Sequence, residues 1–230
     1  MAETKSDIAG SLVPMSKQQA MIMLEAVYLW MDLGNFDHAR DLVTGASALM
    51  PKTKQVQFAL GTLEFNQQRY DKALQAFRAA QRLDPKSALA RAHCAEALLF
   101  MGKSGEALKE LQAAFELEDD GGVPDFAFRL CLFGGALDVE RALKEPNEKK
   151  RAERYDGAVK AFQLAAKVQP AAAEPRVRLG EVYVLTGRSA EGRAELEAAL
   201  KLSPTPEEKA MADKLLEVAS GKVKDAPKKR

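Results

Sequence analysis

Small residues recur along this chain at a fixed interval of 34 residues. Ala39, Ala73 and Ala107 keep this interval, and Ala158 and Gly192 keep it again further along the chain. Ala107 and Ala158 are 51 residues apart, so 17 extra residues lie between two series that share one register. A constant interval of this length is typical of chains that stack copies of one supersecondary unit.

Other positions of the unit keep the same character. The residue seven places after each small residue is always alanine, and the residue four places after it is always large and apolar. Apolar residues at helical spacing, with almost no strand-like alternation, predict two helices per unit that pack antiparallel. The small residues lie where the two backbones approach each other. Four of the five units carry proline twelve places after the small residue, where it ends the second helix.

These columns resemble the tetratricopeptide repeat, a family built from 34-residue helix–turn–helix units. The resemblance covers residues 20–204. It implies an all-α fold, a right-handed superhelix of about five repeats with an insertion in the fourth and a C-terminal capping helix. Ser16 with Gln19, and Thr205 with Glu208, predict the starts of the first repeat helix and of the capping helix. We expect a disordered N-terminus at 1–15, repeats 1–3 at 16–119, repeats 4–5 at 120–204, the capping helix at 205–220 and a disordered basic tail at 221–230.

The 17 extra residues belong to the fourth repeat. If Gly134 is the small residue of its first helix, five of them precede that helix and twelve separate it from the next, around "RALKEPNEKKRAE". Gly135 could serve as well. We expect a long helix and a protruding charged loop.

Composition limits the class of partner. Apolar residues make up 47% of the 230 residues and the formal net charge is +1, which indicates neither a nucleic-acid nor an anionic-membrane partner. The most apolar run, residues 21–31, contains Glu25 and is too short to span a bilayer. The N-terminus lacks an apolar segment of signal-peptide length, so we expect a cytoplasmic protein. Cys94 and Cys131 lie in apolar helical runs and are predicted to be small buried hydrophobes.

Signatures of catalysis are weak. Residues 97–104, "ALLFMGKS", loosely match a phosphate-binding loop, but four apolar residues continue a helix there and Gly102 occupies the turn position of the repeat. His38 and His93 have no ligand partners at metal-binding spacing, which predicts surface or groove residues. We therefore expect no enzymatic activity, no cofactor and no metal.

The resemblance to the family also implies a concave groove lined by the first helix of each repeat. The expected partner-binding residues are Met21, Leu24, Tyr28, Met31, Phe58, Thr62, Phe65, Leu89, Glu96, Leu99 and Phe100. Exposed apolar surface of this kind favours an apolar extended segment or an amphipathic helix of a protein partner. Relatives that grip a C-terminal carboxylate use cations, whereas the corresponding residues in this chain are Leu24, Tyr28, Ala59, Leu89 and His93.

Residues 91–117 also resemble the third repeat of the bacterial type III secretion chaperones that hold hydrophobic translocator proteins, which carry three repeats and an apolar groove. This resemblance implies a chaperone that binds its partner in residues 20–119. The alternative is an assembly scaffold or adaptor that uses its convex face or the inserted loop. The prediction leaves homo-oligomers open, and it includes neither nucleic acid nor insertion into a membrane.

Overall fold

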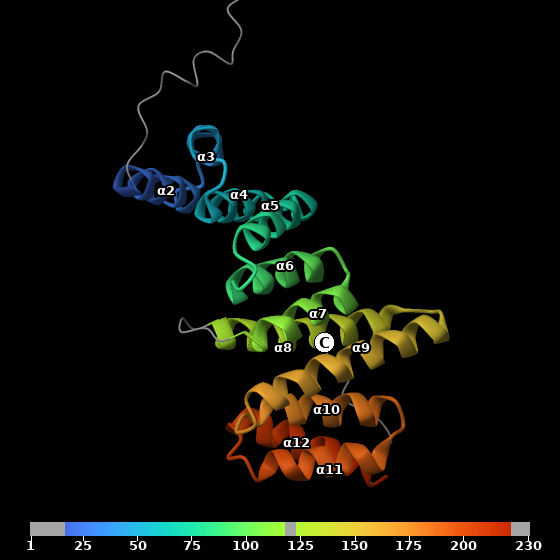
Figure 1. Cartoon of the computed structure of the whole chain (residues 1–230). Coiled ribbons are helices and arrows are strands. Elements are labelled where there is room, and N and C mark those ends of the chain that lie inside the picture. The colour runs from blue at the N-terminus through green and yellow to red at the C-terminus, as the bar shows by residue number, and fades with distance from the viewer. Residues whose placement is uncertain (1–16, 118–122, 222–230) are drawn as a thin grey trace, which may run out of the picture. The chain divides into compact units, whose positions relative to one another are not determined.

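The computed structural model describes residues 17–117 and 123–221, and all regular secondary structure in these ranges is helical. The predicted N-terminal segment, the helix start at Ser16, part of the predicted insertion and most of the basic tail lie outside the described residues. The helices are α2 (Lys17–Asp32), α3 (Phe36–Leu49), α4 (Lys54–Asn66), α5 (Tyr70–Leu83), α6 (Ala88–Phe100), α7 (Ser104–Phe115), α8 (Val123–Lys144), α9 (Glu148–Val168), α10 (Glu174–Leu185), α11 (Ser189–Leu200) and α12 (Pro206–Ala219). The all-α class is confirmed (Figure 1).

The chain forms two compact units, Met1–Lys103 and Ser104–Arg230. In the first unit, α2 packs against α3 and α4 against α5, and α6 packs against α5. In the second unit, α8 packs against α9 and α10 against α11, while α7 lies against α8 and α9. The boundary between Lys103 and Ser104 falls inside the third predicted repeat, between its two helices.

Glycine allows close approach within three of the helix pairs. A Cβ atom on Gly61 would lie 2.4 Å from the Phe77 ring, and a Cβ atom on Gly180 would lie 2.5 Å from the Leu196 side chain. A Cβ atom on Gly135 would lie 2.5 Å from the Phe162 ring. Each of these glycines therefore contacts the large residue that lies four places after the small residue of the second helix. This shared contact identifies Gly135, rather than Gly134, as the small residue of α8.

The extra residues of the α8–α9 pair lengthen both helices. α8 continues nine residues beyond Gly135, where α4 continues five beyond Gly61; α9 begins ten residues before Ala158, where α5 begins three before Ala73. Four and seven residues are close to one and two helical turns, so the same faces of α8 and α9 stay in contact. The sequence predicts a long helix and a protruding charged loop. Both helices are long, but the predicted charged loop is wrong, because only Glu145–Asn147 separate the helices. Figure 1 shows α8 and α9 lying side by side over this length.

Local signals fix the ends of several helices. Thr205 and Glu208 form the predicted capping box, with Pro206 in the first turn, and α12 packs on α10 and α11. Gly34, Gly102 and Gly187 all have positive φ, which confirms Gly102 as a turn glycine rather than part of a phosphate-binding loop.

Cys94 and Cys131 are buried as predicted, and burial raises the pKa of the Cys131 thiol to about 12.

Candidate partner-binding surface

The first helices of the N-terminal unit carry a continuous set of accessible side chains, which we call the first-helix surface. The predicted residues Met21, Tyr28, Leu89 and Phe100 are exposed, and Phe58, Thr62, Phe65 and Glu96 are half-buried. The first-helix surface consists of these eight residues together with His93.

Three predicted residues do not belong to this surface. Leu24 and Met31 are buried in the core that joins α2 to α3 and α4, and Leu99 is buried in α6. The accessible residues of α6 are Leu89, Arg91, His93, Glu96 and Phe100, and all of them except Arg91 follow one another at helical spacings of four, three and four. Three of the four α6 residues predicted for this surface, Leu89, Glu96 and Phe100, are accessible, whereas Leu99 faces the core.

Three aromatic rings from three helices meet on this surface. The centroid of the Phe65 ring of α4 lies 5.1 Å from the centroid of the Phe100 ring of α6, edge to face, and 5.2 Å from the centroid of the Tyr70 ring of α5. Tyr70 and Phe100 stack at 5.0 Å. We call Phe65, Tyr70 and Phe100 the aromatic cluster. Tyr70 was missed from the sequence because it begins a second helix, and only its packing at the turn brings it to this surface.

His93 connects this surface to the core. Its ring stacks on buried Phe77 at 5.0 Å and meets the Phe58 ring edge-on at 5.9 Å. Nδ1 of His93 lies 3.0 Å from a carboxylate oxygen of Glu96. A carboxylate group from a ligand would therefore meet Glu96 beside the imidazole, which disfavours carboxylate binding there.

Tyr28 and Thr62 join α2 to α4. Burial raises the pKa of the Tyr28 phenol above its ordinary value, and a hydrogen bond with the Thr62 side chain opposes part of this effect. Thr62 and Phe65 both lie on α4. Contacts between side chains therefore connect accessible residues on all three first helices of this unit.

Two carboxylates are buried at equivalent positions, three residues after Gly61 and Gly135 respectively. Glu64 accepts a hydrogen bond from Nη1 of Arg40 at 2.7 Å and also pairs with Arg69. Asp138 accepts a hydrogen bond from the Ser104 hydroxyl at 2.8 Å. Arg40 and Ser104 both come from the second helix of the preceding repeat, so each buried carboxylate ties one repeat to the one before it.

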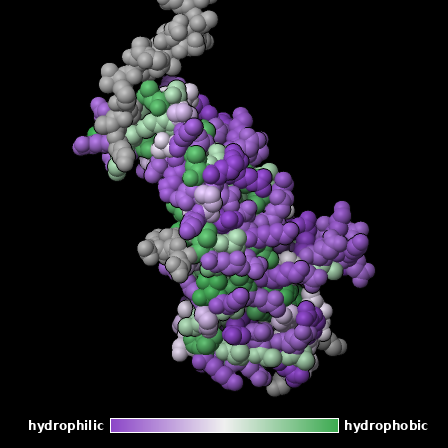
Figure 2. Space-filling view, viewed as in Figure 1, coloured by the Kyte–Doolittle hydropathy of each residue, from purple (hydrophilic) through white to green (hydrophobic). Residues whose placement is uncertain are grey.

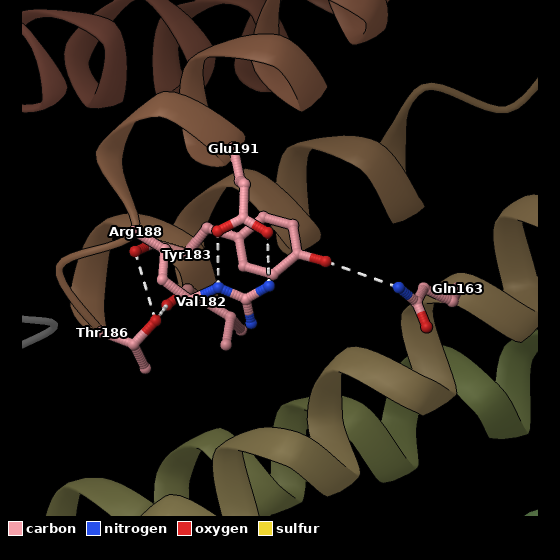
Figure 3. A network of polar contacts seen from close by, with 6 residues as sticks. All are labelled: Gln163, Val182, Tyr183, Thr186, Arg188 and Glu191. Atoms are coloured by element: carbon pink, nitrogen blue, oxygen red, sulfur yellow. Dashed lines mark hydrogen bonds and ion pairs between the residues drawn. The ribbon is translucent and has the colours of Figure 1, made fainter.

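Tyr183 lies three residues after Gly180, the position that Glu64 and Asp138 occupy in their repeats, and it makes contacts of a different kind (Figure 3). The Arg188 guanidinium lies 4.3 Å from the centroid of the Tyr183 ring, and Arg188 donates two hydrogen bonds to Glu191, of 2.7 and 2.5 Å. The hydrogen bond from Arg188 lowers the pKa of the Glu191 carboxyl. Nε2 of Gln163 on α9 lies 3.4 Å from the Tyr183 hydroxyl oxygen. These contacts join α9, α10 and α11, and they indicate a structural role.

The extended ends of α8 and α9, residues 140–154, form a second accessible feature, which we call the tip. Figure 2 shows mainly hydrophilic residues over this end of the pair. Lys144 pairs with Glu140 at 2.5 Å, and Leu143 is an exposed apolar residue among these charges.

Neither metal binding nor membrane crossing has support in the described ranges. Among the described residues, no three or more His, Cys, Asp or Glu side chains are grouped so that they could hold a metal ion. No helix in the described part of the chain is long and apolar enough to cross a membrane.

Known proteins share this sequence pattern and this fold. Human protein O-mannosyl-transferase TMTC1 is 26% identical over 207 residues, which cover 80% of this chain but only 23% of that protein. The crystal structure of MamA has a TM-score of 0.58 at 19% identity, covering 83% of this chain and 93% of that one. YrrB, described as a TPR protein with an unusual peptide-binding site, has a TM-score of 0.56 at 17% identity, covering 86% of this chain and 94% of that one.

Two family models agree with this fold. One model described as tetratricopeptide repeat matches residues 24–88 and 147–205, and a second model with the same description matches residues 64–122. Together the matched ranges contain all five predicted small positions, Ala39, Ala73, Ala107, Ala158 and Gly192, while α8 lies outside them. The chain therefore belongs to the tetratricopeptide repeat family.

Proposed function

We propose that this protein binds an apolar segment of another protein on the first-helix surface and catalyses no reaction. The observation that carries the proposal is the aromatic cluster, in which Phe65, Tyr70 and Phe100 from three helices lie together on an accessible face. Membership of the tetratricopeptide repeat family supports a protein-interaction module, and YrrB, which has a similar fold, is described as having an unusual peptide-binding site.

The chemistry of the surface favours apolar side chains as ligands. Partly exposed aromatic rings offer large apolar area with little conformational entropy to lose on binding. Glu96 lies beside His93, so a terminal carboxylate would meet a carboxylate there. An extended apolar segment or the apolar face of an amphipathic helix fits this surface best. A chaperone for a hydrophobic secreted protein is the most specific form of this proposal.

Affinity purification with mass spectrometry tests the proposal. The doubly substituted variant Phe65→Glu with Phe100→Glu places two charges in the aromatic cluster and should lose the partners that the wild-type chain captures. Leu83→Glu is the matched control, since Leu83 is also about as exposed as Phe100 but lies at the C-terminal end of α5. Partners that remain bound to the double variant, with helical content unchanged, would refute the proposal.

A second candidate function is an assembly scaffold that engages its partners through the tip. Exposed Leu143 among charged residues favours this alternative. A chain that lacks residues 145–152 should then lose its partners, while the Phe65→Glu/Phe100→Glu variant keeps them.

A further inference from the structure

A second apolar stripe runs along α2, separate from the first-helix surface. Ile22, Leu29 and Leu33 are 59%, 58% and 66% exposed. Ile22 and Leu29 are seven residues apart on one side of the helix, and Leu33 directly follows its last residue, where its N–H donates to the Leu29 carbonyl at 3.0 Å. Tyr28 and Met21 lie on the neighbouring side, which belongs to the first-helix surface. We call Ile22, Leu29 and Leu33 the α2 stripe.

The repeat register shows what this face does elsewhere in the chain. The residue equivalent to Ile22 is buried in every later repeat, as Val56, Ala90, Leu130 and Pro175. The residue equivalent to Leu29 is buried as Leu63, Ala97 and Val182 and half-buried as Leu137. Val56 and Leu63 share one core with Val27 and Val43 of the preceding repeat. In the later repeats, the face equivalent to the α2 stripe therefore packs against the preceding repeat. In α2 this face is exposed.

The charged residues of α2 that border the stripe are acidic. Among the described residues from Gln18 to Met50, the exposed charged side chains are Glu25, Asp32, Asp37 and Asp41. The one basic side chain of this segment that carries a permanent charge, Arg40, is engaged by Glu64 and Gln67. Glu25 and Asp32 each follow a stripe residue by three positions, so they line one edge of the stripe.

We infer that the α2 stripe docks an amphipathic helix of a partner protein whose apolar face is bordered by lysine or arginine. The helix takes the place of a preceding repeat: its apolar side covers Ile22, Leu29 and Leu33, and its basic border faces Glu25 and Asp32. A helical occupant is favoured because the equivalent face of α4 packs against helices. The acidic border selects a cationic helix by charge complementarity. This inference does not depend on the proposed function, because it concerns another side of α2.

Titration of the full-length chain with two synthetic peptides, followed by fluorescence anisotropy, tests the inference. Both peptides carry leucine at helical spacing, bordered by lysine in one and by glutamate in the other. The lysine peptide should bind at least about tenfold more tightly than the glutamate peptide, and added salt should weaken its binding. Ile22→Glu with Leu29→Glu should weaken it by about tenfold or more, as expected for buried apolar contacts at a binding site.

Two further variants serve as controls and separate this surface from the others. Glu25→Gln with Asp32→Asn leaves the apolar stripe intact and should reduce the preference for the lysine peptide. Phe65→Glu with Phe100→Glu should bind the lysine peptide like wild type, even where it has lost the partners of the first-helix surface. Circular dichroism checks that the substituted chains remain helical, which is expected because Ile22 and Leu29 are more than half exposed.

Several results would overturn the inference. One is equal binding of the two peptides, and another is unchanged affinity in the Ile22→Glu/Leu29→Glu variant. Much tighter binding after removal of residues 1–15 would identify the chain's own N-terminal segment as the occupant. A dimer in analytical ultracentrifugation that dissociates on Leu29→Glu would identify a second copy of the chain.

Discussion

There is room only for a hydrogen atom on the Cα of Gly135, because a Cβ atom there would lie 2.5 Å from the Phe162 ring. Gly135→Ala should lower the free energy of unfolding, because overpacking costs roughly 1–3 kcal/mol and outweighs a gain in helix propensity of roughly 0.5–1 kcal/mol. Urea denaturation measures the change. Phe162→Leu in the same chain should recover part of the loss, since it shortens the side chain that meets the new methyl group.

Gly105 provides the control for this substitution. It lies in the first turn of α7, and a Cβ atom there would meet no other atom within 4 Å. Gly105→Ala should therefore leave stability unchanged or raise it slightly. Equal effects of the two substitutions would contradict the assignment of Gly135 to the close approach between α8 and α9.

Asp138 gives stability a pH dependence of known sign. Burial raises the pKa of its carboxyl above 3.8, although the Ser104 hydrogen bond and the charges of Arg141 and Arg154 act in the opposite direction. Between 3.8 and the raised value, the folded state holds a proton that the unfolded state has lost. The free energy of unfolding contributed by this group therefore falls as pH rises through that window.

Asp138→Asn removes this titration. The stability of the variant relative to wild type should increase as pH rises above about 4, because the wild-type carboxyl loses its proton as pH passes its raised pKa and the amide does not. Melting temperatures of both chains across this range measure the difference. A difference that stays constant with pH would show that the buried carboxyl does not carry a raised pKa.

At the level of helices, α8 and α9 are longer than their counterparts by about one and two turns. Deleting residues 140–143 and 148–154 restores the ordinary spacing between Gly135 and Ala158 and keeps the facing surfaces of the helices in phase. Because the deletion removes Arg141 and Arg154, it is best made together with Asp138→Asn. The deletion variant that also carries Asp138→Asn should unfold cooperatively, with a melting temperature near that of Asp138→Asn alone, as measured by circular dichroism.

A smaller deletion should do more damage. Removing only Lys149 and Lys150 turns the start of α9 by more than half a revolution relative to the rest of the helix. That change separates the facing residues of α8 and α9 or strains the turn. If the larger deletion proves more destabilising than the smaller one, the extra residues do not extend the pair in phase.

The repeat columns predicted the helix pairs well, because a buried position has the same neighbours in every copy. Gly61 and Gly180, for example, make equivalent close contacts with Phe77 and Leu196. Spacing could not choose between Gly134 and Gly135, since both are small, and the contact with Phe162 decided it. On α6, the alanine-rich sequence gave little hydrophobic contrast, so buried Leu99 was assigned to the surface together with Leu89, Glu96 and Phe100.

At the level of the whole molecule, the C-terminal end is covered and the α2 stripe is not. Leu215 and Ala212 of α12 complete a core with Val177, Leu196 and Ala199. Leu215 is fully buried, so Leu215→Ala should lower the stability of the second unit by roughly 2–5 kcal/mol. Lys214→Ala is the control, because Lys214 is exposed on the same helix.

The effect of Leu215→Ala should also be confined in space. Repeats gain their stability mainly from their nearest neighbours, so damage at one end weakens the adjacent helices first. Hydrogen exchange should become faster in α10, α11 and α12 and remain unchanged in α2–α5. If hydrogen exchange became equally faster in α2–α5, the two units would unfold as one cooperative body. The changes in unfolding free energy predicted for the other variants would then describe the stability of the entire chain.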